Sequence, residues 1–339
     1  MKFALLVALL SACTSEAPVA APPPPRAPTA VPSVPLAAEP TIEVHAEPMP
    51  ALTGHPAHTV RFVPGGTRLA AVGSGGDYTV RVWSVEEQRE IARIPIYASG
   101  FDIDPSGRFV VMGRKEVATL WDVDRGAAVH DFGGHWDWVE QVAFHPDGER
   151  IATYDDSPEL RVFDVESGRL IARAGDAGPQ SLVRDMTLSS SWLTWVEIGQ
   201  GSIRRWNLET GEVTGLDVPA GAGRLAQTPD GRWLAATLTQ TPMPGKVAAG
   251  ALSGIWNTET GAYSEVAGVA YLLAFTPDGR VLATVHEDLI RLVDVEAGQL
   301  VATTRASGQV TSLAIGADHV LAAAVPSMGE VQLWRLVYE

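Results

Sequence analysis

The chain has 339 residues, with 25 Lys and Arg against 40 Asp and Glu, and a formal net charge of −15 at pH 7. Such an acidic chain argues against nucleic acid and against anionic membrane faces as partners. It contains a single cysteine, so no disulfide can form within the chain and the fold must be held by packing alone.

The first thirteen residues have the order of an export signal. Lys2 supplies a positive charge, residues 3–10 form an apolar run, and the small residues Ser11 and Ala12 precede Cys13. As a helix the run would rise about 12 Å, which is too short to cross a hydrocarbon core of about 30 Å. The segment is therefore expected to be a signal and not a membrane span.

Cys13 has two readings, an incidental thiol behind an ordinary cleaved signal or a lipid attachment point. The stretch Leu10-Ser11-Ala12-Cys13 resembles the lipobox of bacterial lipoproteins. The resemblance implies that residues 1–12 are a lipoprotein signal peptide and that Cys13 becomes the lipidated first residue. Two or three acyl chains on this residue would anchor the protein stably. Thr14, where aspartate would signal retention at the inner membrane, implies the outer membrane, at its periplasmic face or the cell surface.

Residues 13–50 are rich in Pro, Ala and Val, as in "APVAAPPPPRAPTAVPSVPLAAEP". Such a stretch lacks the apolar bulk for a core and favours extended polyproline conformations. We therefore predict a disordered tether over 13–50, acting as a passive spacer, and a folded domain over 51–339.

The folded part repeats a short apolar strand with an aromatic or branched residue near its end. Aligning "TVRVW", "VATLW", "ELRVF", "SIRRW", "LSGIW", "LIRLV" and "VQLW" gives spacings of 38, 42, 43, 50, 37 and 41 residues between Trp83, Trp121, Phe163, Trp206, Trp256, Val293 and Trp334. Turns such as Pro146-Asp147-Gly148 separate the strands, because proline fixes φ and glycine accepts the left-handed conformation. Seven such copies predict an all-β fold, a seven-bladed β-propeller with four-stranded antiparallel blades.

These motifs resemble those of WD-repeat β-propellers. Trp121-Asp122 is the name-giving dipeptide, and Gly54-His55 and Gly134-His135 place a histidine 28 residues before an aligned aromatic residue. The resemblance implies a hydrogen-bond network of His, Ser or Thr, Asp and Trp within each blade. The family's aspartate, six residues before the aromatic, is present only as Asp77, so we expect the network to be mostly lost.

The closure of the ring follows from a count of strands. The last copy ends at "VQLWRLVYE", its third strand, and a missing fourth strand would leave an exposed edge. We therefore predict that a segment within residues 41–55 completes the seventh blade, as the family resemblance also implies.

Catalytic and metal motifs do not stand out in the sequence. His55 and His58 lie three residues apart, but His55 holds the Gly-His position and no third ligand stands nearby, so we expect no metal and no cofactor. Asp155-Asp156 and Glu287-Asp288 lie between second and third strands, where paired carboxylates could act as acid and base or bind calcium. Acidic turn residues are common in so acidic a chain, so we assign no catalytic residues.

The stretch "GHWDWVEQ" places Trp136 and Trp138 in the loop that leads into the third blade. Trp138 either plugs the interface between blades or joins a surface, whereas Trp136 is harder to bury and suits an exposed anchor, because tryptophan is enriched in binding hot spots. Family geometry places on the same face the insertion at 239–254 and a ring of residues: His58, Ser99, Glu140, Arg184, Gly223, Tyr271 and Thr311. The binding candidates are Trp136, Trp138, Glu140, His58, Arg184 and Tyr271.

Three functional hypotheses follow. The first is a lipid-anchored scaffold of the cell envelope that binds a protein or envelope component through this face and touches the membrane only through its anchor. The alternative is a propeller enzyme, a hydrolase, lyase or quinoprotein-like dehydrogenase, with its site in the central channel, where Arg61, Asp102 and Asp185 are the charged residues expected to converge. The third is a structural member of an envelope assembly without a dissociable ligand.

Overall fold

The computed structural model describes residues 40, 42–63, 66–73, 79–95, 98–157, 159–174, 182–197, 202–216, 218, 221–239, 252–266 and 268–338. All of these belong to one compact unit, residues 31–339. The signal, Cys13 and the tether up to residue 39 lie outside the described residues. Within the described part, no helix has the length and apolar character needed to cross a membrane.

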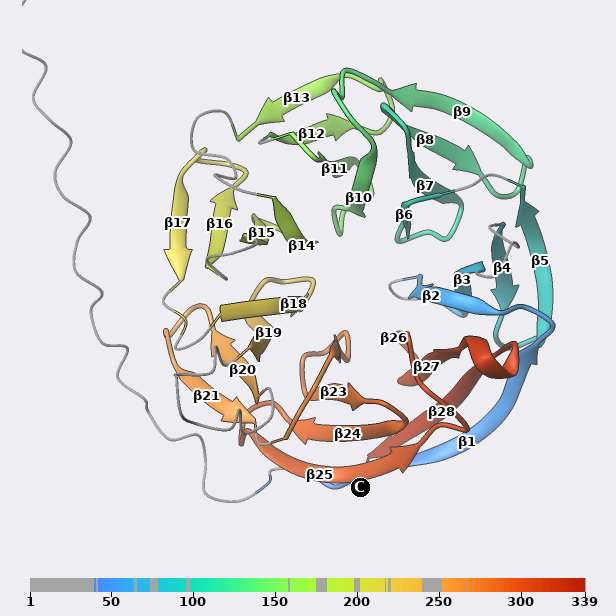
Figure 1. The fold of residues 1–339 in the computed structure, drawn as a ribbon, viewed down its shortest axis with the longest axis vertical. Coiled ribbons are helices and arrows are strands. Elements are labelled where there is room, and N and C mark those ends of the chain that lie inside the picture. The colour runs from blue at the N-terminus through green and yellow to red at the C-terminus, as the bar shows by residue number, and fades with distance from the viewer. Residues whose placement is uncertain are drawn as a thin grey trace, which may run out of the picture. The chain divides into compact units, whose positions relative to one another are not determined.

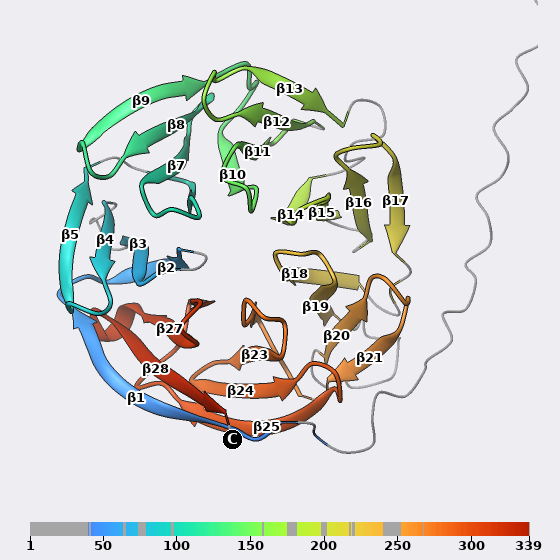
Figure 2. The ribbon, with the colours of Figure 1, turned by 180° about the vertical axis from the view of Figure 1, so that it is seen from behind.

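The described strands form seven four-stranded antiparallel sheets arranged around a central axis, which confirms the predicted seven-bladed propeller (Figures 1 and 2). In blades one to six, four consecutive strands pair in chain order. Blades one and two comprise β2 (Ala57–Phe62), β3 (Arg68–Gly73), β4 (Val80–Ser84), β5 (Arg89–Ile94), β6 (Gly100–Ile103), β7 (Phe109–Arg114), β8 (Val117–Asp122) and β9 (Ala127–Phe132). Blades three and four comprise β10 (Val139–Phe144), β11 (Arg150–Asp155), β12 (Leu160–Asp164), β13 (Leu170–Arg173), β14 (Val183–Leu188), β15 (Trp192–Glu197), β16 (Ile203–Asn207) and β17 (Val213–Leu216).

Blades five and six comprise β18 (Gly221–Gln227), β19 (Trp233–Thr239), β20 (Leu252–Asn257), β21 (Tyr263–Val266), β22 (Leu272–Phe275), β23 (Val281–His286), β24 (Leu289–Asp294) and β25 (Gln299–Arg305). Blade seven comprises β26 (Ser312–Ile315), β27 (Val320–Val325), β28 (Glu330–Tyr338) and β1 (Val44–Thr53), with a short 3₁₀ helix, η2 (Pro326–Met328), before β28. Residues 252–254, assigned above to the blade-five insertion, belong to β20, and residues 240–251 lie outside the described part.

The core lies between neighbouring blades. Successive residues of a strand point to opposite faces of its sheet, so each blade packs against both of its neighbours. Between blades two and three, for example, Val111, Leu120 and Phe132 pack against Val142 and Ile151. The seven aligned residues lie on the third strands, as predicted, and this repeated packing is what produces the repeat in the sequence.

Strand β1 closes the ring by pairing with β28, and the two strands lie side by side in blue and red (Figures 1 and 2). Val44 lies opposite Tyr338 and Thr53 lies opposite Glu330, so the prediction that a segment within 41–55 completes blade seven is confirmed. The tether boundary at residue 50 was wrong, because residues 44–50 already form part of β1. Counting strands locates the closing segment but not the residue where it begins.

Candidate functional site

One face of the propeller carries the candidate binding residues. In an antiparallel blade, the loop into the first strand and the turn between the second and third strands lie at the same end of the sheet. The loop before β10 contains Trp136 and Trp138, so we call this side of the ring the tryptophan face. The start of β28 lies on the same face and its end on the opposite one, so β1 enters the propeller from the opposite face.

Trp136 is 81% exposed and Trp138 is 43% exposed, so neither side chain is an interior plug. Their loop is nevertheless held in place by a buried carboxylate. The backbone N–H of Trp136 donates to Asp155 Oδ2 at 2.7 Å, and the N–H of Asp137 donates to the same oxygen at 3.3 Å. The exposed indole of Trp136 thus extends from a backbone that a buried side chain holds in place.

Asp155 is fully buried and belongs to an ionic network. Its Oδ1 accepts hydrogen bonds from the Arg161 guanidinium at 2.8 Å and from the Ser157 hydroxyl at 2.5 Å. Arg161 is also fully buried, and its Nη2 lies 2.6 Å from Glu159 Oε2. Burial by itself raises the pKa of Asp155, but the bonds from Ser157, the Trp136 N–H and Arg161 outweigh it and lower the pKa. The network therefore holds an ionised carboxylate under the tryptophan loop.

The Gly-His histidines are structural. His55 is fully buried with its ring 5.4 Å from that of Trp83, and His135 Nε2 lies 2.8 Å from Thr153 Oγ1. Blade three thus keeps more of the family network than the sequence predicted. The carboxylate comes from Asp155, two residues before position 157, where the family pattern places the aspartate. Asp77 lies outside the described residues.

Three exposed carboxylates accompany the two tryptophans: Asp137, Glu140 and Asp156. Partial burial of Glu140, together with the charges of Asp156 and Asp137, raises the pKa of Glu140. Asp137 and Asp156 are therefore each close enough to Glu140 to repel its charge. Of these three carboxylates, only Glu140 is among the binding residues predicted from the sequence. Asp155 and Asp156 are adjacent in the sequence, but the structure buries Asp155 and exposes Asp156.

The remaining candidates are distributed around the ring. Arg184 and Tyr271 are exposed at the starts of β14 and β22, and the Tyr271 ring lies 5.1 Å from that of His286. Tyr271 is three blades away from Trp136, so the structure does not bring the two together. His58 lines the central channel.

Two other members of the predicted ring connect neighbouring blades. The Ser99 hydroxyl donates to the carbonyl of Val139 at 2.6 Å, and the Thr311 hydroxyl donates to that of His58 at 2.8 Å. Both hydroxyls are thus engaged with the next blade.

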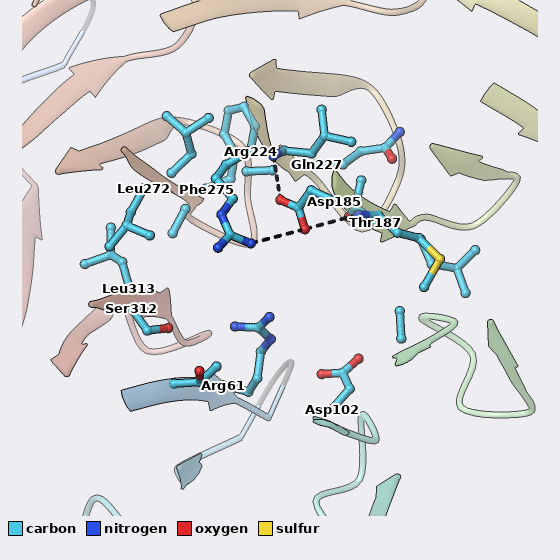
Figure 3. A pocket seen from close by; sticks show the side chains of 18 of the residues that line it. Arg61, Asp102, Asp185, Thr187, Arg224, Gln227, Leu272, Phe275, Ser312 and Leu313 are labelled. Atoms are coloured by element: carbon cyan, nitrogen blue, oxygen red, sulfur yellow. Dashed lines mark hydrogen bonds and ion pairs between the residues drawn. The ribbon is translucent and has the colours of Figure 1, made fainter. Parts of the chain in front are cut away.

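The central channel forms a cavity of about 360 Å³ between the first strands. Arg61, Asp102 and Asp185 line it, as predicted, and Figure 3 shows Arg224 of β18 pointing into the same space. Asp102 Oδ2 accepts the N–H of Phe144 at 2.8 Å, and Asp185 Oδ2 accepts that of Leu225 at 2.8 Å. Each aspartate therefore connects its blade to the next one.

Burial raises the pKa of both channel aspartates above the ordinary value, with Arg61 partly offsetting the effect at Asp102 and Arg224 partly offsetting it at Asp185. The two aspartates lie in β6 and β14, on separate blades. In the part of the chain that the structure describes, no group of three or more His, Cys, Asp or Glu side chains is arranged to hold a metal ion.

Fold and repeats together define a seven-bladed β-propeller, and two segments of its chain match WD40 repeats. Residues 46–84 and 126–164 match the family described as "WD domain, G-beta repeat". Each match ends on the third strand of a blade and includes a buried histidine, His55 or His135.

Several characterised proteins are similar to parts of the chain. It is 34% identical over 121 residues to Transcription initiation factor TFIID subunit 5 of Caenorhabditis elegans, covering 34% of this chain and 18% of that protein. It is 30% identical over 207 residues to Guanine nucleotide-binding protein subunit beta of Zea mays, covering 53% and 51%. It is 27% identical over 146 residues to Apoptotic protease-activating factor 1 of Homo sapiens, covering 40% and 12%. The chain thus spans about half or less of the length of these relatives.

Proposed function

We propose that this protein is a binding platform that holds a protein partner on the tryptophan face. The observation that carries the proposal is Trp136, an indole 81% exposed on a backbone fixed by a buried carboxylate. Exposure of a large apolar side chain to water is unfavourable, and tryptophan is among the residues most enriched in interface hot spots. A loop that is already ordered loses less entropy when it binds.

The charges around the tryptophans favour a partner segment that carries Lys or Arg. Asp137, Glu140 and Asp156 present negative charge beside exposed aromatic rings. A cation is attracted both to the face of an indole ring and to carboxylates. The names of two of the relatives, subunit 5 of TFIID and subunit beta of a guanine nucleotide-binding protein, are those of subunits in assemblies, which supports a role in protein binding.

Trp136→Ala is expected to weaken binding of the partner at least about tenfold, as hot-spot truncations do, and to leave the unfolding midpoint unchanged. A photo-crosslinking amino acid at position 136 of the full chain in intact cells, followed by mass spectrometry, identifies the partner. Titration of the purified partner then compares Trp136→Ala with Ile171→Ala, a control on the outer strand β13 where the side chain is 53% exposed. Equal affinities for the two variants would refute the role of this face.

We further infer that the platform is tied to the cell envelope, on the outer membrane, through a lipid on Cys13. The lipobox-like stretch at residues 10–13 and the proline-rich residues after it support this inference. The point where β1 enters the propeller supports it as well, because Val44 lies on the face opposite the tryptophans. A tether attached there would leave the binding face directed away from the bilayer.

The anchor is tested by metabolic labelling in a bacterial host. We expect radiolabelled palmitate to be incorporated into the wild-type chain and not into Cys13→Ala, and the variant to leave the membrane fraction. Ser11→Thr, which keeps the cysteine, serves as the control. Absence of label in the wild-type chain would overturn the anchor and leave the binding platform untouched.

The enzymatic alternative draws little support from the channel. Besides the bonds to the next blade, Asp102 Oδ1 accepts the N–H of Ile103 at 3.0 Å and Asp185 Oδ1 accepts that of Met186 at 3.1 Å. Both carboxylates are therefore engaged by backbone donors at each oxygen. A general acid or base must instead reach a substrate proton.

A further inference from the structure

Two arginine side chains enter the central channel from opposite sides. Arg61 comes from β2 in blade one and Arg224 from β18 in blade five, and both line the cavity of about 360 Å³. Figure 3 shows the two guanidinium groups pointing towards one another across the channel. Both side chains are exposed to solvent in the channel, so a ligand that enters the channel can reach their N–H groups.

Among the described residues, the channel aspartates accept no hydrogen bond from these arginines, although Arg224 and Asp185 form an ion pair. Arg224 Nη1 lies 3.9 Å from Asp185 Oδ1, beyond hydrogen-bond distance, and the Asp185 oxygens already accept backbone N–H groups. Arg61 Nη1 donates to the carbonyl of Val60 at 3.0 Å, and Arg61 forms no ion pair among the described residues. Since a guanidinium carries five N–H donors, most of the donors of both side chains remain available to a ligand.

We propose that the channel binds an oxyanion, a carboxylate or a group of phosphate type, between Arg61 and Arg224. The planar guanidinium fork fits two oxygens of such a group, and an anion between two cations replaces their repulsion with two attractions. The oxyanion is either a free small ion or the side chain of an acidic residue on a bound protein. Neither arginine is among the residues proposed to bind a partner on the tryptophan face, so this proposal does not depend on that one.

Binding is expected to strengthen as the pH falls. The groups that face the site are the two arginines, Asp102, Asp185 and His58. Burial raises the pKa of both aspartates, so they lose their competing negative charge at a higher pH than an ordinary aspartate would.

The test is calorimetric titration of the full chain with sodium sulfate, an oxyanion of constant charge, at fixed ionic strength. We expect saturable binding with one site, which tightens as the pH falls from about 7.5 towards the ordinary aspartate pKa of 3.8. Arg61→Gln and Arg224→Gln should each weaken binding about tenfold or more, and Arg61→Lys, which keeps the charge without the fork, should weaken it less. Arg169→Gln, an exposed arginine in the β12–β13 turn, is the matched control and should bind sulfate as the wild type does.

A capped tripeptide with a central glutamate distinguishes the two sources of the oxyanion. Competition between this peptide and sulfate supports a partner's carboxylate, whereas binding of sulfate alone supports a free anion, and either result supports the site. Wild-type chain that shows no saturable sulfate binding overturns the proposal. So does unchanged affinity in a folded double variant, Arg61→Gln with Arg224→Gln.

Discussion

A chain that begins at Gly54, and therefore lacks β1, is expected to lose a large part of its stability. Strand β1 completes blade seven, and Ile42, Val44 and Leu52 are buried there. Full burial of an aliphatic side chain contributes about 1.5–3 kcal/mol, so these three side chains contribute on the order of 6 kcal/mol. That is comparable with the about 5–15 kcal/mol that stabilises a typical domain.

The truncation also leaves β28 as an open edge, with the buried side chains of Leu333 and Leu336 uncovered. We therefore expect a lower urea midpoint, measured by circular dichroism, together with concentration-dependent association. A chain that begins at residue 40 retains β1 and is the matched control. If both chains unfold at the same urea concentration, closure through β1 is not what holds blade seven together.

The repeat could be predicted from the sequence because every blade packs against its neighbours in the same way. The third strand presents one residue to the space between blades, and the requirement is for bulk and not for one residue type, since Trp83 and Val293 are both buried there. The closing strand was predictable for a similar reason, because an incomplete blade has an unpaired edge.

The contents of the channel were only partly predictable. Gly223 is the residue of β18 predicted for the ring, whereas the neighbouring Arg224 was not predicted to line the channel. The register between β18 and β19 shifts between Ala222 and Leu225, and a bulge of this kind interrupts the alternation of side chains along a strand. Arg224 points into the channel at this irregularity (Figure 3). A prediction that assumes strict alternation of side chains along the strand therefore misses it.

The support under Trp136 was also not predictable from spacing. The family pattern directs attention to position 157, which is a serine, whereas the carboxylate is supplied by Asp155. Asp155 and Asp156 look alike in the sequence. Their difference arises from strand β11, whose last residue is Asp155 and is buried, while the next residue faces solvent.

Asp155→Ala is expected to lower the free energy of unfolding by about 3 kcal/mol, at the lower end of the cost of breaking a buried ion pair, because Glu159 still contacts Arg161. The substitution removes the carboxylate that accepts the hydrogen bond of Arg161 Nη1, and it leaves the Trp136 N–H without its acceptor. Asp156→Ala, at the exposed neighbouring position, should change the free energy by less than about 0.5 kcal/mol. Urea unfolding of both variants beside the wild type gives the comparison.

The pH dependence separates the loss of this network from a general packing defect. The pKa of Asp155 is lowered in the fold from the ordinary 3.8, so its stabilising contribution is complete above that value and is lost as the pH falls through the folded pKa. The difference between wild type and Asp155→Ala should therefore shrink in acid. A difference that stays constant down to about pH 2 would mean that the carboxylate's charge is not what holds Arg161 and the tryptophan loop. Residue 155 is buried and cannot touch the partner. If Asp155→Ala also weakens binding of the partner, the network that holds the tryptophan loop is needed for the platform.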